Sequence, residues 1–297
     1  MNYDEAFWMR HADWSSRRIA NEYGVDDGSV RRKKREAKKK WPWLFDKTEV
    51  AKVTRGVAVF DLHYPHHNRP LWKNLLRFVS DFRPDVFIFG GDNLNMDAVD
   101  HWRREKNQQR ALEGRRLKHD YSGFNRDILE PLSDALPGTC RLIWHHGNHE
   151  DWVEQYIDSH PEAEGFLEVE TNLGLADWEI YDYGRSSAIG KLHVIHGEYV
   201  NEYNAAKTVR VYHRNIIYGH GHTMQAFTEI TPLDSDAHTS TQIPCACNLN
   251  PDYRRNKPNA WLNGFAVFHV MPGGNFNLYP VVAFGGAFVA PNGEMYA

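Results

Sequence analysis

From Val53 onward, short apolar runs alternate along the chain with segments that have helical periodicity. Runs of strand-forming residues bounded by turn residues predict buried strands. They occur at 56–61, 86–92, 140–146, 191–196 and 215–220. Between the first two runs, Leu71, Leu75, Phe78 and Phe82 recur at helical spacing, which predicts a helix from Pro70 to Pro84. Strands that alternate with helices predict an α/β core.

Two further segments depart from this alternation. The charged stretch from Asp97 to about Leu136 has a helical pattern and predicts a long helical connection. Near the end of the chain, 264–284 consists of two apolar runs around the turn Pro272-Gly273-Gly274. That pattern predicts an antiparallel pair of strands.

The first 40 residues predict a pair of helices. Ser15 or Ser16 can cap the first helix, Gly24 can end it, and the second can start near Asp27. The segment resembles a helix-turn-helix, with Ala20, Gly24 and Val30 in the family's small, glycine and aliphatic positions. Lys33 stands where a second apolar residue is usual. The alternative is a helical hairpin that docks on the main domain or on another subunit.

Charge is distributed unevenly along the 297 residues. The net charge is -4, yet residues 1–50 contain 12 Lys+Arg against 9 Asp+Glu, and 31–40 alone holds eight cations and one anion. Such a block is typical of a solvated helix face or of a phosphate-binding arm. Arg31, Arg32, Lys33 and Lys34 are therefore candidates for nucleic-acid binding. We predict a basic helix-turn-helix-like extension at 1–50 and a main domain at 51–297.

The composition favours a cytoplasmic protein. No apolar run approaches the roughly 20 residues of a membrane span, and the first residues lack the features of a secretory signal. Cys140, Cys245 and Cys247 are an odd number in a large domain, which argues against a disulfide framework, and we interpret the last two as packing thiols.

Polar residues with metal-binding side chains follow each predicted strand of the core. Open α/β sheets place their sites at the carboxyl ends of strands, so these residues are expected to meet at one edge. Oxygen and imidazole donors at five strand ends exceed the four ligands of a structural zinc site. They are Asp61 and His63, Asp92, Asn148 and His149, His196, and His220 and His222.

The order of these motifs, D-L-H, G-D, G-N-H-E, H-G and G-H-G-H, resembles the calcineurin-like metallophosphoesterase superfamily over roughly residues 53–285. The resemblance implies a four-layer α/β/β/α sandwich that binds two divalent metal ions. It assigns Asp61, His63 and His222 to one ion, and Asn148, His196 and His220 to the other. Asp92 would bridge the two ions, with one carboxylate oxygen for each, and Gly90 and Gly91 would let the backbone turn sharply before it. Manganese is our first expectation, and iron, zinc, nickel and cobalt stay open.

Two bound cations would polarise phosphoryl oxygens and convert a bridging water into a hydroxide nucleophile. His149 resembles the family's histidine that protonates or stabilises the leaving oxygen. Serine/threonine phosphatases of the family carry an aspartate and an arginine where this chain has Asn95 and Met96. Asn95 is expected to accept a hydrogen bond from His149, whereas Glu150 is expected only to orient the loop.

Substrate choice follows from charge. The segment 101–120 has seven Lys+Arg against three Asp+Glu and follows the Asp92 loop. With the basic extension it favours a polyanion, so we expect a phosphodiesterase on DNA, similar to SbcD-type repair nucleases and to phosphoesterases of phage and prophage. The alternatives are a phosphatase or phosphodiesterase of small molecules, including cyclic nucleotides, and a DNA-binding regulator with a non-catalytic metal domain. The oligomeric state stays open, with a homodimer among the options.

Overall fold

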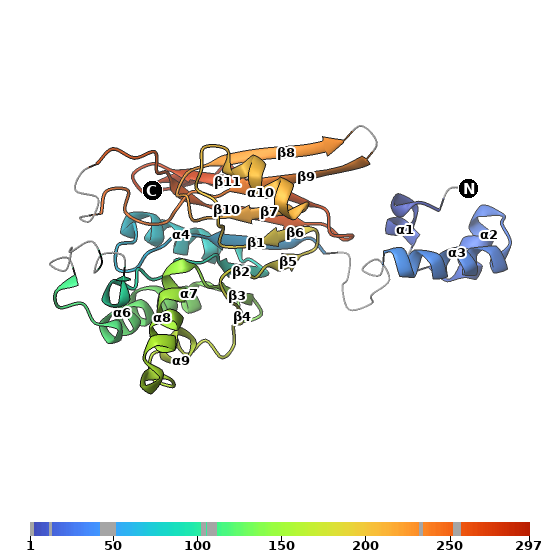
Figure 1. Cartoon of the computed structure of the whole chain (residues 1–297). Coiled ribbons are helices and arrows are strands. Elements are labelled where there is room, and N and C mark those ends of the chain that lie inside the picture. Colours follow the sequence, from blue (N-terminus) through green and yellow to red (C-terminus); the bar gives the residue numbers. More distant parts are fainter. Residues whose placement is uncertain are drawn as a thin grey trace.

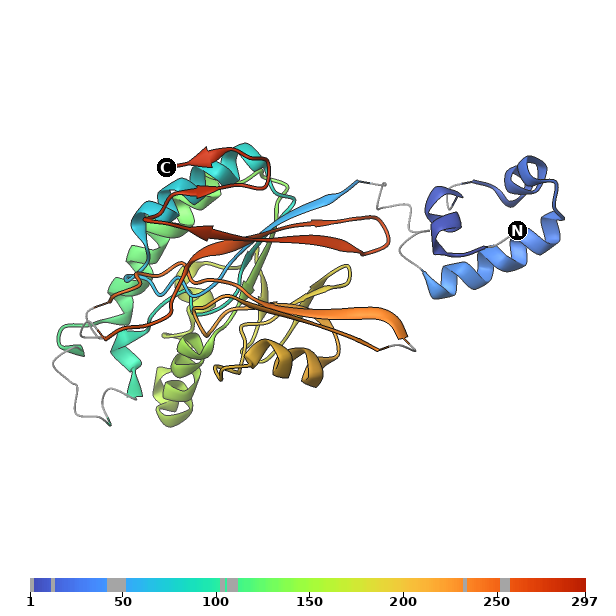
Figure 2. The ribbon, with the colours of Figure 1, turned by 90° about the horizontal axis from the view of Figure 1, so that it is seen from above.

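The computed structural model describes the chain except for residues 1–2, 12–13, 42–51, 102–104, 106–111, 232–233 and 252–256. The chain begins with the helices α1 (Glu5–His11), α2 (Ser16–Tyr23) and α3 (Asp27–Lys40). The Ser15 side chain accepts the Arg18 N–H at 3.1 Å and caps α2, and Gly24 ends it with φ of 63°. The predicted pair of helices and its turn are therefore confirmed. The ribbon is shown in Figures 1 and 2.

These helices have a hydrophobic core of their own. Trp8, Ile19 and Val30 have no exposed surface and pack together with Phe7 and Ala37. The proposed limit between residues 50 and 51 lies outside the described residues. The division into two domains thus stays a prediction.

The larger sheet of the main body runs in the order β11-β10-β1-β2-β3-β4. Neighbours among β1 to β4 are parallel, whereas β10 is antiparallel to both β1 and β11. The predicted antiparallel pair at the end of the chain is confirmed, with Val270 opposite Phe276. The strands are β1 (Thr54–Val59), β2 (Val86–Phe89), β3 (Arg141–His145), β4 (Glu179–Tyr181), β10 (Asn263–Val270) and β11 (Phe276–Ala283).

A second sheet runs in the order β5-β6-β7-β9-β8. Its strands are β5 (Ser187–Ile189), β6 (Leu192–Val194), β7 (Asn215–Tyr218), β8 (Gln225–Thr231) and β9 (Asp234–Gln242). Strands β6, β7 and β9 are parallel, and β8 returns antiparallel to β9. A short pair, β12 (Phe288–Val289) and β13 (Met295–Tyr296), follows β11.

Helices cover the outer faces of both sheets. They are α4 (Arg69–Phe82), α6 (Leu117–Phe124), α7 (Glu130–Ala135), α8 (Asn148–Ser159), α9 (Val169–Leu173) and α10 (Asn204–Tyr212). Helix α4 begins after Asn68, whose side chain accepts the Leu71 N–H at 3.1 Å. None of the helices in the described part of the chain is long and apolar enough to cross a membrane.

The alternation of side chains along β1 shows how the layers are built. Val57 and Val59 face the helices α4, α6, α7, α8 and α9, whereas Ala58 and Phe60 face the second sheet. Helix α10 packs on β8 and β9 at the other face of the second sheet. Within the described residues the layers are thus helix, sheet, sheet and helix, and the predicted α/β/β/α sandwich is confirmed.

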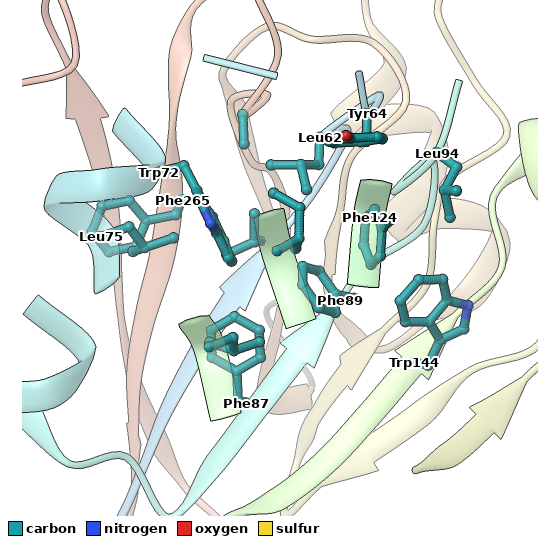
Figure 3. Close-up of a cluster of buried hydrophobic side chains, with 14 of the residues drawn as sticks. Leu62, Tyr64, Trp72, Leu75, Phe87, Phe89, Leu94, Phe124, Trp144 and Phe265 are labelled. Atoms are coloured by element: carbon teal, nitrogen blue, oxygen red, sulfur yellow. The ribbon is translucent and has the colours of Figure 1, made fainter. Parts of the chain in front are cut away.

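Aromatic side chains fill the core between the larger sheet and its helices. Phe89 on β2 lies at the centre of this cluster and contacts Phe124 of α6 and Trp144 of β3, with ring centroids 6.0 and 5.3 Å away (Figure 3). Trp72 of α4 stacks on Phe89 from the other side of the cluster. This packing fixes β1, β2 and β3, whose carboxyl ends carry the candidate site.

The connection between β2 and β3 differs from the long helical stretch predicted from the sequence. A turn at 112–116 interrupts it after the short helical turn Asp97–Val99, and 117–135 then forms one helical stretch in which the π-helical segment Asn125–Leu129 joins α6 to α7. Gly114 lies in that turn with φ of 76°, a conformation that a continuing helix excludes. The predicted helical connection is therefore confirmed for 117–135 and is broken at 112–116.

Candidate metal centre

The predicted ligands lie directly after strands of both sheets, on loops or, for Asn148 and His149, at the start of α8. They are Asp61 and His63 after β1, Asp92 after β2, Asn148 and His149 after β3, His196 after β6, and His220 and His222 after β7. Because the carboxyl ends of these strands point to the same end of the sandwich, the structure brings all of these side chains together.

These loops have unusual backbone geometry. Asp61, His63, Asp92, His220 and His222 all have φ between 49° and 67°, in the left-handed region. This left-handed conformation costs an L-residue roughly 1–3 kcal/mol, and residues with such strained backbone cluster at functional sites. The fold thus stores strain at the positions that the sequence motifs single out, a feature that the sequence pattern did not predict.

Gly90 and Gly91 before Asp92 serve two different purposes. Gly91 has φ of 99°, as expected for a sharp turn, and a Cβ there would lie 2.5 Å from Nδ1 of His196. Gly90 lacks a positive φ, and a Cβ on it would lie 2.1 Å from the ring of Phe60. The expectation that both glycines are needed for the turn is therefore wrong for Gly90, which is small so that Phe60 can pack.

One group of donors comprises Asp61, His63 and His222, which are 0%, 2% and 6% exposed. Nε2 of His222 lies 3.1 Å from Nε2 of His63 and 3.4 Å from Oδ1 of Asp61. Donor atoms separated in this way can all reach a cation at about 2.0–2.2 Å. The arrangement fits one divalent ion.

A second group comprises Asp92, His196 and His220, with ligand atoms within 4.8 Å of one another. Nε2 of His196 lies 3.3 Å from Oδ2 of Asp92 and 3.2 Å from Oδ1 of Asn148. The amide oxygen of Asn148 therefore adds a further donor to this group. These residue types suit a second divalent ion.

Asp92 lies between the two groups. Its Oδ2 is 3.3 Å from Nε2 of His196 in one group and 3.7 Å from Nε2 of His63 in the other. Its Oδ1 accepts the main-chain N–H of His149 at 2.9 Å. The structure thus turns a single oxygen toward both groups, whereas the sequence led us to expect one oxygen for each ion.

The second ring nitrogens of the histidines show which lone pairs face the centre. Nδ1 of His63 donates to Oδ1 of Asn95 at 3.0 Å, and Nδ1 of His196 donates to the carbonyl of Gly90 at 3.1 Å. Oxygen acceptors require the proton on Nδ1, which leaves the lone pair on Nε2 for a cation. Metal-binding histidines are oriented in this way in general.

The charges of the site shift the pKa values of its histidines in opposite directions. Burial and the neighbouring His149 hold the pKa of His63 well below its usual range, so that its ring is neutral. Burial opposes a charge on His196 too, but the carboxylate of Asp92 outweighs it and raises the pKa to about 9. A metal cation bound between His196 and Asp92 would replace the positive charge of the protonated His196 ring beside the Asp92 carboxylate.

His149 is the second residue of α8 and lies at the edge of both groups. Its ring packs on Trp152 with centroids 3.9 Å apart, and its Nε2 is 3.8 Å from Oδ2 of Asp92. Nδ1 donates to the main-chain carbonyl of Asn95 at 2.8 Å. The histidine is thus held from behind while Nε2 faces the centre.

The prediction of a hydrogen bond from His149 to the Asn95 side chain is right about the residue and wrong about the atom. The main chain of Asn95 makes that contact, and its side chain orients His63 instead. The Asn95 amide donates to Oδ1 of Asp97 at 2.6 Å, and Oδ2 of Asp97 lies 3.4 Å from Nε of Arg115. The guanidinium of Arg115, which belongs to the basic segment 101–120, is thereby held next to the loop that carries Asp92.

Glu150 does more than the sequence suggested. It is completely buried, and its carboxylate accepts main-chain N–H groups from both loops that flank the centre. The donors are Asp92, Asn93, Leu94 and Gly147, at 2.8 to 3.0 Å. The carboxylate therefore ties the Asp92 loop to the start of α8. The spacing of Glu150 from Gly147 resembles a helix-capping pair, the signal that could have indicated this role.

Cys245 and Cys247 lie against the ligand His222. Both are buried, and Sγ of Cys247 is 3.8 Å from Nδ1 of His222. The interpretation of these residues as plain packing thiols therefore misses their position beside the centre.

The basic residues proposed for nucleic-acid binding lie on α3 and differ in their contacts. Arg31 pairs with Asp27 at 2.5 Å, and Lys33 pairs with Glu36 at 2.8 Å. Lys34 donates to the carbonyl of Trp14 and so joins α3 to the segment before α2. Arg31 and Arg32 are exposed, whereas Lys33 and Lys34 are half-buried.

Comparison with protein-family models and with curated proteins gave no match. Similar solved structures include Vps29 of Entamoeba histolytica complexed with Zn²⁺, with 12% identity, a TM-score of 0.38 and coverage of 77% of this chain and 92% of that one. Vacuolar protein sorting 29 of Cryptosporidium parvum has 13% identity, a TM-score of 0.43 and coverage of 80% and 94%. A predicted phosphoesterase of Streptococcus pneumoniae has 9% identity, a TM-score of 0.29 and coverage of 77% and 99%.

Proposed function

We propose that this chain is a phosphoesterase that depends on two divalent metal ions and hydrolyses phosphodiester bonds. The observation that carries the proposal is the position of Asp92, whose Oδ2 faces His196 of one donor group and His63 of the other. Two cation sites that share one carboxylate oxygen are an arrangement suited to phosphoryl transfer.

The residues divide as the motif resemblance implies. Asp61, His63 and His222 would hold one cation, and Asn148, His196 and His220 the other, with Asp92 shared. When bound, such a pair of cations polarises phosphoryl oxygens and lowers the pKa of a bound water. Manganese suits the mixture of carboxylate, amide and imidazole donors, with iron, zinc, nickel and cobalt as further options.

His149 would act on the leaving oxygen. Its Nδ1 is committed to the carbonyl of Asn95, so the nitrogen available to a substrate is Nε2. From there the ring can donate a proton or a hydrogen bond to the oxygen on which negative charge develops. Trp152 supports the ring from one face and limits its rotation.

DNA is the substrate class that we propose. The exposed arginines of α3 and the placement of Arg115 beside Asp97 support a polyanionic substrate, because phosphate contacts by Lys and Arg dominate affinity for nucleic acid. In this proposal the extension 1–50 binds DNA and the main domain 51–297 cleaves it in the cytoplasm.

A panel of substrates on metal-reconstituted protein tests this function. An aryl phosphodiester, an aryl phosphomonoester, cyclic nucleotides, and single- and double-stranded DNA would be compared, with Asp92→Asn as the inactive reference. We expect metal-dependent cleavage of the aryl diester and of DNA. Preference for a monoester or a cyclic nucleotide would favour a small-molecule enzyme, and no turnover with any divalent ion would favour a binding protein.

A charge-matched pair of variants tests the role of α3. Arg31→Gln with Arg32→Gln should weaken DNA binding and flatten its dependence on salt, since each lost phosphate contact lowers the slope of log affinity against log salt by about 0.9. Lys73→Gln with Arg214→Gln removes the same charge from exposed positions of the main body and serves as the control. Equal slopes in both double variants would contradict DNA binding by α3.

A further inference from the structure

The two ring nitrogens of His222 face different surroundings. Nε2 lies 3.4 Å from Oδ1 of Asp61, within the donor group described above. Nδ1 lies 3.8 Å from Sγ of Cys247. His222 therefore stands between the oxygen and nitrogen donors of the centre and a pair of sulfur atoms.

The sulfur atoms of Cys245 and Cys247 lie close together, on either side of a bend at Ala246. Both are reduced and buried, at 0% and 1% exposure, and Ala246 between them packs into the core on the helix side of the larger sheet. The two sulfur atoms and one ring nitrogen of His222 lie within 4.8 Å of one another. This proximity makes the three atoms candidate ligands of one ion.

The backbone that carries the cysteines is held firmly. Cys245 donates its N–H to the carbonyl of Leu262 at 3.0 Å. The side-chain amide of Asn263 donates to the carbonyls of Cys245 and Cys247, at 3.2 and 2.6 Å. A preformed set of donors binds a cation without the cost of ordering a flexible loop.

We propose that Cys245, Cys247 and Nδ1 of His222 form a binding site for one thiophilic divalent cation, such as Zn²⁺ or Cd²⁺. Thiolate and imidazole ligands select such ions, whereas the carboxylate, amide and imidazole donors on the other side of His222 also accept harder ones. Binding releases the two thiol protons to solvent, and a neutral His222 ring with its proton on Nε2 offers the lone pair of Nδ1 to the ion.

Occupation of this site would inhibit the phosphoesterase. A neutral imidazole has a free lone pair on one nitrogen and a proton on the other. A cation at Nδ1 therefore leaves the proton on Nε2, which then cannot bind a cation in the group with Asp61 and His63. This second step rests on the proposed function, whereas the binding of the thiophilic ion does not. A thiophilic ion bound at Cys245 and Cys247 would then inhibit phosphodiester hydrolysis, because it occupies His222.

Titration of the metal-free full-length protein with Cd²⁺ tests the site without any measurement of turnover. Thiolate-to-cadmium charge-transfer absorption should grow to saturation in the wild type and in Cys140→Ser, since Cys140 lies at the opposite end of β3. Cys245→Ser and Cys247→Ser should each bind Cd²⁺ roughly 10-fold or more weakly, with a smaller absorption. Asp61→Asn should keep the absorption. Unchanged absorption in both Cys245→Ser and Cys247→Ser would overturn the proposal.

Two further measurements complete the test. X-ray absorption on wild-type protein with one equivalent of Zn²⁺ should show sulfur neighbours at about 2.3 Å, even if a cysteine variant does not fold. A spectrum with only oxygen and nitrogen neighbours would overturn the proposed site.

In Mn²⁺-loaded protein, half-inhibition of aryl diester hydrolysis should require at least roughly 10-fold more Cd²⁺ in Cys245→Ser than in Cys140→Ser. Equal inhibition would contradict the competition, and absence of hydrolysis in the wild type would instead refute the proposed function.

Discussion

Nδ1 of His149 donates a hydrogen bond to the main-chain carbonyl of Asn95, with 2.8 Å between the two atoms. The acceptor belongs to the backbone, so it is present whatever side chain stands at position 95. This contact fixes the tautomer of His149 and directs Nε2 to the centre. The chain thereby orients the histidine without an aspartate at position 95.

His149→Asn should leave both cations bound and slow turnover by roughly 10²- to 10⁴-fold. The larger loss is expected for diesters with a poor leaving group, because these depend most on the donated proton. Rates for a series of aryl diesters with different leaving-group pKa values measure the effect. A rate on the poorest leaving group that equals the wild-type rate would refute this role.

Asn95→Ala should affect the metal centre and spare His149. The variant removes the acceptor of His63 Nδ1 while the main-chain carbonyl stays in place. Affinity for the cation at Asp61, His63 and His222 should fall by roughly 10- to 100-fold. At saturating metal, the leaving-group dependence of the rate should match the wild type. A steeper dependence in Asn95→Ala would show that the side chain, too, orients His149.

Glu150→Gln should destabilise the loops around the centre. The amide that replaces one carboxylate oxygen would point its own N–H groups at main-chain N–H donors, so two of the contacts would be lost. We expect the free energy of unfolding to fall by about 3 kcal/mol or more and the melting temperature to be lower. Glu154→Gln, one turn further along α8 and exposed, is the control. Equal melting temperatures of the two variants would contradict the bracing role of Glu150.

Metal affinity should rise with pH. In the metal-free protein Asp92 outweighs burial and raises the pKa of His196 to about 9, so a cation that binds at Nε2 must displace a proton below that pH. Burial lowers the pKa of His63, which needs no such displacement. Apparent Mn²⁺ affinity should therefore increase by up to about 10-fold per pH unit between pH 7 and 9. Calorimetry in buffers of different ionisation enthalpy measures the released protons. A Mn²⁺ affinity that does not change between pH 7 and 9 would refute the displacement of a proton.

The sequence predicts the positions of the candidate ligands because each follows an apolar run, and topology alone then brings strand ends together. Asp61 and His222 are far apart along the chain, yet the parallel arrangement of β1 with β2 and of β6 with β7 places both at one end of the sandwich. The fold was predictable for the same reason. Helix α4 follows from apolar spacing and from Pro70 at its start, whereas the strands end one to three residues earlier than predicted.

Contacts that depend on three-dimensional packing were not predictable. The hairpin of β8 and β9 is rich in polar residues and has no clear apolar alternation. Nothing in the sequence distinguishes the main chain of Asn95 from its side chain as the acceptor of His149. The sulfur of Cys247 meets His222 only because Asn263 and Leu262 hold the two segments together.

Metal analysis of the wild type and of Asp92→Asn tests most directly whether one carboxylate serves two cation sites. The variant keeps the shape of the side chain but removes its charge, and Oδ2 faces His63 and His196 alike. After reconstitution with Mn²⁺, we predict two equivalents per chain in the wild type and a marked loss from both sites in Asp92→Asn, with nearly all diesterase activity lost. Two full equivalents in Asp92→Asn would contradict the shared carboxylate.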